Sequence, residues 1–166
     1  RFPVNAKNIN LIKKDFYIIR DDDDHVGIIE DIIINRDEEL NETMTVKGRF
    51  LQSILGRRII APQTNCSGRL SNCIEALVNS CLINPVISAR KVNNFIIDPS
   101  SFTDKIDTQF TGDNLLKIVS ELCMVYGVGF KVTMNSSNQF VFKLYKGEDR
   151  TYDQDKNPWV IFSDQY

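Results

Sequence analysis

Four consecutive aspartates, Asp21 to Asp24, precede the single histidine of the chain, His25. They are the most obvious candidates for a metal site. Calcium loops, however, space their oxygen ligands at alternate positions and need a distal bidentate carboxylate. Four adjacent carboxylates point in divergent directions and repel one another instead. The run therefore predicts a solvated turn between two strands, with a weak cation site as the alternative.

Catalysis by a Ser-His-Asp or Cys-His arrangement would have to use His25, inside that acidic turn. The sequence contains no G-x-S-x-G elbow, no P-loop and no dinucleotide fingerprint. Gly127-Val-Gly129 follows a predicted helix, which indicates a helix end rather than a phosphate cradle. We therefore expect no enzyme active site, cofactor or metal ion in this chain.

The four cysteines form no CxxC pair. Cys73 and Cys81 fall on the apolar face of one predicted helix and Cys123 on that of another. Free cysteine in such positions behaves as a small hydrophobic residue. We predict buried, reduced thiols rather than a disulfide or metal site, which fits synthesis in a cytoplasm. The fourth cysteine is Cys66.

The composition is that of an ordinary globular protein, with 42% hydrophobic and 25% charged residues among 166. A chain of this length forms one domain, or one domain with a subdomain. The net charge of −2 argues against a nucleic-acid partner, which normally requires a basic excess. No apolar stretch approaches the ~20 residues of a membrane span.

The segment 45–60 contains the most informative glycine. Gly48 and Arg49 end a β-rich stretch, and glycine permits a sharp strand exit or a close backbone approach. Apolar residues then recur on one helix face, which predicts a short helix at 49–56. We expect Gly48 and Arg49 to form a structural pivot.

Arg57 and Arg58 follow that helix, and Arg150 lies in Gly147-Glu-Asp-Arg150 near the C-terminus. Arginine pairs bidentately with carboxylates, and this chain is rich in acids. We predict that these three arginines form ion pairs at intersubunit or interdomain contacts.

For residues 1–62, the sequence predicts a β-meander or a part of a β-barrel. Strands are expected within 9–20, at 26–35 and at 42–47, separated by turns. In the long strand 26–35, alternation places Ile28, Glu30, Ile32 and Ile34 on one face. Because its other face is also apolar, this strand is expected to be central in a strongly curved sheet.

For residues 63–166, the sequence predicts an α+β subdomain. Residues 62–68 read as a polar loop, and amphipathic helices are expected at about 70–82 and 113–126. A hairpin is expected at about 129–145, where two alternating arms flank Asn135-Ser-Ser-Asn138. The predicted fold class is α+β: an antiparallel, partly open β-barrel-like meander with two amphipathic helices and a C-terminal β-hairpin.

The order of the motifs resembles a known family. The motifs are Val26-Gly-Ile-Ile-Glu-Asp, Val46-Lys-Gly-Arg-Phe-Leu with Arg57, the helix 70–82, Tyr126-Gly-Val-Gly-Phe, Gly147-Glu-Asp-Arg150 and Trp159-Val-Ile-Phe-Ser163. Over nearly the whole chain, this order resembles siphophage and prophage tail proteins, whose relatives include hub proteins at the tail tip or baseplate.

The resemblance implies a structural role in tail assembly and host attachment. It implies a barrel-like domain, three copies of which form a ring, and other phage tail proteins as partners. The expected location is the virion tail, after assembly in the bacterial cytoplasm. We also expect the chain to be part of a longer protein and, in isolation, monomeric or weakly associated.

Two other functions remain open from the sequence. A receptor- or glycan-binding module would present exposed aromatic side chains, for which Tyr145, Tyr152, Trp159 and Tyr166 are candidates. A cell-wall hydrolase is the third possibility, although the sequence offers no catalytic ligands or nucleophile for it.

Overall fold

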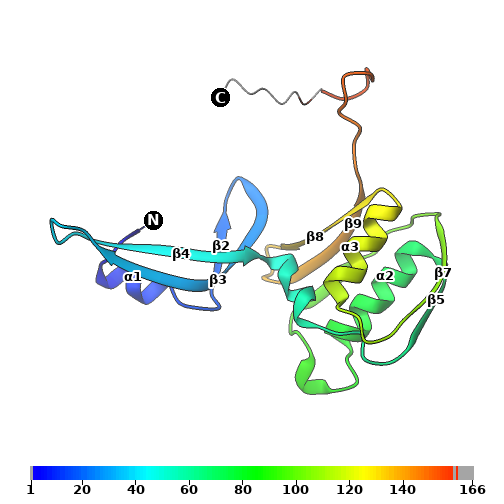
Figure 1. Cartoon of the computed structure of the whole chain (residues 1–166), viewed down its shortest axis with the longest axis horizontal. Coiled ribbons are helices and arrows are strands. Elements are labelled where there is room, and N and C mark those ends of the chain that lie inside the picture. Colours follow the sequence, from blue (N-terminus) through cyan, green and yellow to red (C-terminus); the bar gives the residue numbers. More distant parts are fainter. Residues whose placement is uncertain (1, 159, 161–166) are drawn as a thin grey trace.

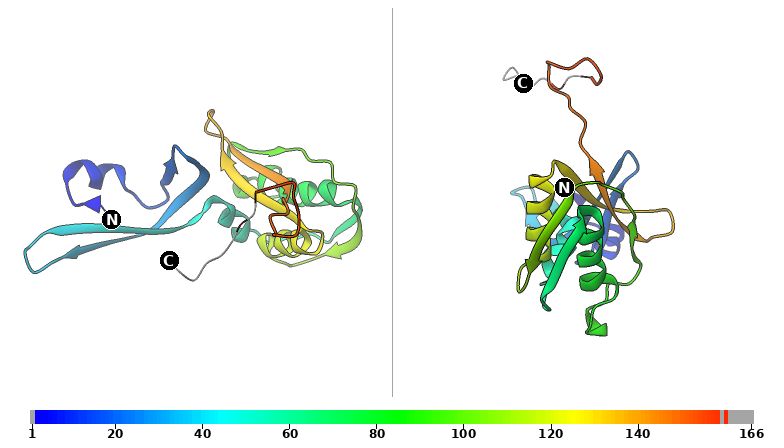
Figure 2. Two further views of the ribbon diagram at one scale, coloured as in Figure 1. Left: turned by 90° about the horizontal axis from the view of Figure 1, so that it is seen from above. Right: turned by 90° about the vertical axis from the view of Figure 1, so that its right-hand side faces the viewer.

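The structure is a computed structural model that describes residues 2–158 and 160. A long β-rich arm, residues 2–50, extends from a rounded body, residues 51–146 (Figure 1). The view from above in Figure 2 shows the same arrangement. The predicted α+β class is confirmed, with an antiparallel sheet that curls into a half-barrel. Of the motif Trp159-Val-Ile-Phe-Ser163, only Val160 is among the described residues.

The arm is a four-stranded antiparallel sheet in the order β1-β4-β3-β2. β3 therefore lies inside the sheet, as its apolar faces predict. A helix, α1, connects the two short outer strands. The elements are β1 (Phe2–Pro3), α1 (Ala6–Leu11), β2 (Tyr17–Arg20), β3 (Asp23–Arg36) and β4 (Glu42–Phe50).

The prediction of strands within 9–20 is confirmed at its end by β2, but it is wrong for residues 9–11, which belong to α1. Asn5 caps this helix: its side-chain oxygen accepts a hydrogen bond from the Asn8 backbone N–H at 2.9 Å. Asparagine is among the best N-cap residues. This local signal outweighs the imperfect alternation that suggested a strand.

A β-bulge interrupts β3 between Ile29 and Asp31. Ile29 is opposite Gly48 and Asp31 is opposite Lys47, so Glu30 is the extra residue. An extra residue reverses the alternation of side chains beyond it. The prediction that Ile28 shares a face with Ile32 and Ile34 is therefore wrong.

The body follows directly from β4. The predicted short helix at 49–56 is a 3₁₀ helix, η1 (Leu51–Arg57), and the two predicted long helices are α2 (Leu70–Val78) and α3 (Leu115–Val125). α2 continues as a π-helical turn, η2 (Asn79–Ile83), and a 3₁₀ turn, η3 (Ser88–Arg90), follows. The strands are β5 (Thr64–Arg69), β6 (Phe95–Asp98), β7 (Lys105–Phe110), β8 (Val128–Met134) and β9 (Phe140–Lys146).

The predicted C-terminal hairpin is confirmed as β8 and β9, which pair in antiparallel register. β6 adds a parallel strand beside β9. The prediction of a loop over 62–68 is wrong, because β5 pairs with β7 about forty residues further along the chain. The proposed division of the chain at residues 62/63 stays a prediction.

The core lies in the body and includes only the base of the arm. Val26 and Ile28 of β3 join the buried residues of η1, α2, α3 and the hairpin. All four cysteines are buried with free thiols, as predicted. Burial raises the pKa of Cys66 to about 12 and that of Cys123 to about 11. Among the described residues, no helix is long and apolar enough to cross a membrane.

Candidate assembly interface

An ion-pair cluster lies where the arm joins the body. The Glu30 carboxylate, at the bulge of β3, accepts hydrogen bonds from Arg49 Nε at 2.9 Å and Nη2 at 2.7 Å. Arg57 Nη2 of η1 also donates to this carboxylate, at 3.3 Å. The hydrogen bonds from Arg49 lower the pKa of Glu30, and Arg57 contributes less. Two of the predicted arginines thus share one carboxylate.

Gly48 makes this cluster possible, because it lies across from the bulge that presents Glu30. A Cβ atom on Gly48 would lie 1.7 Å from the carbonyl oxygen of Ile28. Any other residue would force β3 and β4 apart at this point. The role of Gly48 and Arg49 as a structural pivot between arm and body stays a prediction. The part these residues play in intersubunit contacts stays a prediction.

Arg58 has different hydrogen-bond partners from that cluster. Its Nη2 donates to the backbone oxygen of Arg90 at 2.8 Å, and its Nη1 donates to that of Arg57 at 3.1 Å. Its buried Nε has no hydrogen-bond partner among the described residues. Arg58 thereby holds η3 against the strand-like segment after η1.

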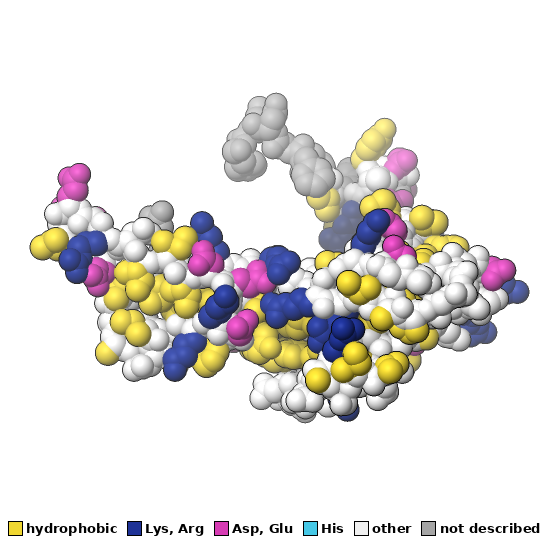
Figure 3. All heavy atoms as spheres, turned by 60° about the horizontal axis from the view of Figure 1, so that its bottom comes forward, with side chains coloured by type: hydrophobic (Ala, Val, Ile, Leu, Met, Phe, Trp, Pro, Cys, Tyr) yellow, Lys and Arg dark blue, Asp and Glu magenta, His cyan; other side chains and the backbone are white. Residues whose placement is uncertain are grey.

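A surface groove of about 380 Å³ opens beside Arg58, and we call it the body groove. Its walls are mostly apolar, with arginines at one side. They are formed by Arg58, Ile59, Ala61, Pro62, Ser80, Cys81, Asn84, Pro85, Val86, Ile87 and Arg90. Figure 3 shows basic side chains gathered where the arm meets the body, with hydrophobic side chains around them.

Arg150, the third predicted ion-pair arginine besides Arg57 and Arg58, lies elsewhere. It pairs with Glu148 at 2.9 Å within the segment that follows β9. That segment, orange to red in Figure 1, leads away from the body. The structure therefore does not bring Arg150 to the cluster at Glu30.

The aspartates of the run Asp21–Asp24 pair with different basic residues. Asp22 pairs with Arg20 at 2.6 Å, and Asp24 pairs with Lys131 of β8 at 2.9 Å. Asp23 contacts His25. The pair between Asp24 and Lys131 fastens the arm to the C-terminal hairpin. Within the described part of the chain, no group of three His, Cys, Asp or Glu residues is arranged to hold a metal ion.

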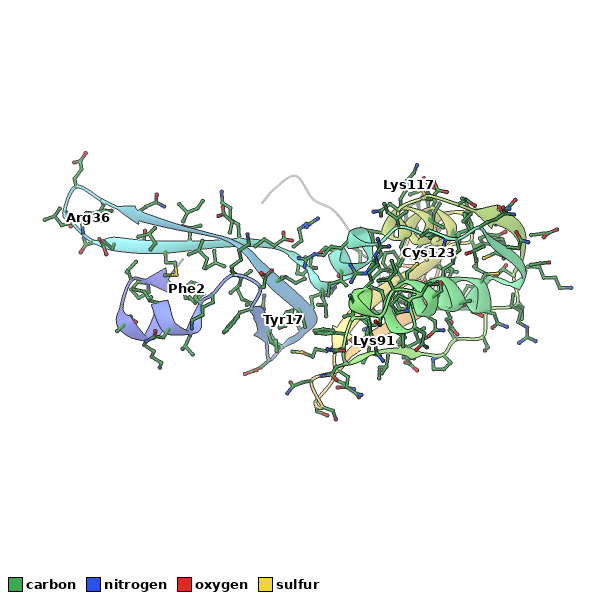
Figure 4. The ribbon with its side chains drawn as sticks, turned by 90° about the horizontal axis from the view of Figure 1, so that it is seen from below. Phe2, Tyr17, Arg36, Lys91, Lys117 and Cys123 are labelled. Atoms are coloured by element: carbon green, nitrogen blue, oxygen red, sulfur yellow. The ribbon has the colours of Figure 1, made fainter. Side chains whose placement is uncertain are left out.

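The arm carries many exposed apolar side chains, which the sequence reading did not identify as a surface. Figure 3 shows hydrophobic side chains spread over the arm, and Figure 4 shows Phe2 and Tyr17 standing on it. A folded monomer does not normally leave large apolar patches in water. The exposed members are Phe2, Ile9, Leu11, Phe16, Tyr17, Ile18, Ile19, Ile34, Leu40 and Phe50.

The arm sheet also has open edges. Within the described residues, β2 pairs on one side only, with β3, and β1 covers just Thr43 and Met44 of β4. An unpaired strand edge is a template for pairing with another chain. Together with the apolar side chains, these edges make the arm a candidate assembly surface.

The aromatic residues considered for glycan binding form no described cluster. Tyr145 is on β9, and its ring covers Gly129 of β8. Tyr152 is exposed in the C-terminal segment. Trp159 and Tyr166 lie outside the described residues, so the set as a whole stays a prediction.

Comparison with known proteins identifies a family. The model of the family described as Siphovirus ReqiPepy6 Gp37-like protein matches residues 1–166. No curated protein matches the chain.

Two solved structures are similar in part. One is prophage tail protein gp18 from Listeria monocytogenes EGD-e, with 16% identity, a TM-score of 0.49, and coverage of 80% of this chain and 36% of that one. The other is the E. coli c3393 protein, a component of the type VI secretion system with structural similarity to T4 bacteriophage tail proteins gp27 and gp5. It shows 12% identity, a TM-score of 0.49, and coverage of 78% and 35%. The chain thus spans about a third of the length of these solved chains.

Proposed function

Because this chain belongs to the Siphovirus ReqiPepy6 Gp37-like family, a siphovirus tail protein family, we propose that it is a structural component of the tail tip or baseplate hub. The family supports a structural role in the virion tail, with other tail proteins as partners. Position at the tip, participation in host attachment and assembly in the host cytoplasm belong to the proposal. So does the absence of an enzymatic activity from this segment.

The observation that carries the proposal is the arm. It presents exposed apolar side chains and two incompletely paired strand edges on one projecting half-barrel. Burial of such surface is favourable by about 25 cal/mol per Å². A neighbouring subunit that covers the arm would therefore stabilise the assembled tail, whereas the isolated chain leaves the arm in water.

The proposed assembly is a ring of three copies. A half-barrel with open edges can be completed by strands of adjacent copies, which removes the edges altogether. A closed ring would also match the symmetry of the tail tube to that of the tip. The cluster of Glu30 with Arg49 and Arg57 would hold the arm at a fixed angle to the body during this assembly.

Immunogold electron microscopy of phage particles tests the proposal. Antibodies raised against this chain should place gold at the distal end of the tail only. Antibody pre-adsorbed with the purified chain gives the matched control and should leave the tip unlabelled. Gold along the tube, on heads, or absent from particles would contradict a tip location.

A further inference from the structure

The body groove has the chemistry of a receptor for an acidic, apolar segment. Its described lining contains no Asp or Glu, whereas Arg58 and Arg90 lie at its side. A smaller adjoining hollow shares these two residues and adds Arg57. Val86, which is 92% exposed, and the exposed Ile87 and Ile59 give the groove apolar walls open to water. An occupant should therefore bring an apolar side chain flanked by carboxylates.

The far end of the arm offers such a segment. The turn between β3 and β4 is Asp37-Glu-Glu-Leu-Asn41, and we call it the arm tip. Leu40 is 71% exposed and is held at a positive φ of 64°. The Asp37 side chain accepts a hydrogen bond from the Asn41 backbone N–H at 2.8 Å, which fixes the turn. The arm tip thus displays one leucine beside three acids on a preformed loop.

The arm tip and the body groove of one chain are far apart. Figure 4 shows Arg36, next to the arm tip, at the far end of the arm, and Lys91, next to Arg90, on the body. A contact between them within one chain would require the arm to fold back. A contact between two chains needs no such change.

We propose that the arm tip of one copy docks into the body groove of the next copy. Leu40 would enter between Ile59, Val86 and Ile87, and the carboxylates of Glu38 and Glu39 would face Arg58 and Arg90. Because the two surfaces differ, the contact is heterologous, and its repetition gives a ring if the rotation closes. The inference gives the proposed hub ring a specific contact, and it rests on that proposed function.

The proposed contact is small, so it should be weak for one pair of chains. Exposed ion pairs at the rim of an interface contribute little affinity and are screened by salt. A ring makes several such contacts at once, and each closure then becomes an intramolecular event. Covalent trapping at low ionic strength is therefore a better test than equilibrium affinity.

The test uses two single-cysteine variants of the whole chain, Leu40→Cys and Val86→Cys, one of them carrying a size tag. The mixed chains are treated with a short bismaleimide at low ionic strength. We expect a tagged–untagged dimer, because docking brings the two new thiols together. The four native cysteines are buried, so the parent chain gives the background.

A matched control replaces Val86→Cys by Met124→Cys, since Met124 is 82% exposed on α3 and lies outside the body groove. We expect about tenfold less dimer with this partner, because only random collision joins the thiols. Equal dimer yields for the two pairings, or no dimer with Val86→Cys, would overturn the inference. A groove that binds a different tail protein would give that second result.

Charge reversal provides an independent test. Glu38→Arg in the Leu40→Cys chain, or Arg90→Glu in the Val86→Cys chain, should reduce the dimer yield. The two reversals together should restore it, which loss of folding could not do. If the reversals leave the yield unchanged, the proposed pairing of acids with arginines is wrong.

The outcomes separate this inference from the proposed function. Gold at the tail tip without specific cross-linking would reject the docking contact and keep the tip location. Specific cross-linking with gold elsewhere on the particle would support the contact between copies and reject the tip location.

Discussion

The body and the arm of this protein differ in how much of their apolar surface they bury. In the body, Phe142, Leu55 and Leu77 are completely buried in one core. In the arm, Ile19 on β2 and Ile34 on β3 are each 55% exposed, although they are equally apolar side chains. The difference indicates that the body is stabilised by its own packing. The arm carries apolar surface that its own fold leaves in water.

The largest change in the free energy of unfolding is expected when a core residue of the body is truncated. Phe142→Ala should lower the free energy of unfolding by about 3–5 kcal/mol, because it removes a fully buried ring and leaves a cavity. Urea denaturation followed by circular dichroism measures this loss.

The matched change in the arm is Ile34→Ala, at a side chain that is 55% exposed. It should change the free energy of unfolding of the isolated chain by no more than about 0.5 kcal/mol. Equal losses for the two variants would show that the arm is part of the cooperative core, against the contrast drawn above.

An intermediate effect is expected at Gly48, the predicted pivot between the two regions. Gly48→Ala should destabilise the chain by about 1–3 kcal/mol, because the added Cβ overlaps the Ile28 carbonyl oxygen and the strands must separate. Gly147→Ala is the control, since no described heavy atom lies within 4 Å of the Cβ it would add. Thermal unfolding of both variants measures the difference. A Gly48→Ala chain as stable as the control would remove the basis for the pivot.

The smallest effect should appear in the pH dependence of stability. The pKa of Glu30 is lowered in the folded chain, chiefly by Arg49, so its stabilising contribution is complete above the ordinary glutamate pKa of about 4.3. That contribution is lost as the pH falls through the lowered folded value. Glu30→Gln should therefore flatten the acid side of a plot of thermal midpoint against pH.

Glu121→Gln removes a carboxylate from α3 without touching Arg49 and is the control for that measurement. The ion pair of Glu121 with Lys117 is long, at 3.9 Å, and exposed, so we expect the acid side of this variant's plot to stay close to that of the parent chain. If Glu30→Gln also follows the parent chain, the ion-pair cluster does not help to hold the arm against the body.

The sequence predicted correctly those elements whose signals lie within one short stretch of the chain. The hairpin β8–β9 was predictable because alternation and a short turn lie within one stretch of chain. The pairing of β5 with β7 was not, because its polar strand is defined by a partner distant in sequence. The bulge at Glu30 left no mark in the alternation, so the faces of β3 were assigned wrongly beyond it.

The same contrast between local and long-range signals holds for the candidate site. Gly48, Arg49 and Arg57 stood out by residue type and spacing. Their common partner Glu30 lies 19 and 27 residues before the two arginines, and no local pattern connects them. The exposure of the arm could not be predicted from the sequence either. An apolar strand has the same sequence pattern whether a core or a neighbouring molecule covers it.

The central claim is that the arm is an assembly surface, and complementation tests it most directly. A phage lacking this gene would be supplied with Ile34→Glu on the arm or Val125→Glu, an equally drastic change at an exposed position on α3. Purified chains of both variants should unfold like the parent. We predict that Ile34→Glu abolishes tail assembly seen by electron microscopy, whereas Val125→Glu gives normal particles. Normal tails with Ile34→Glu would contradict the claim.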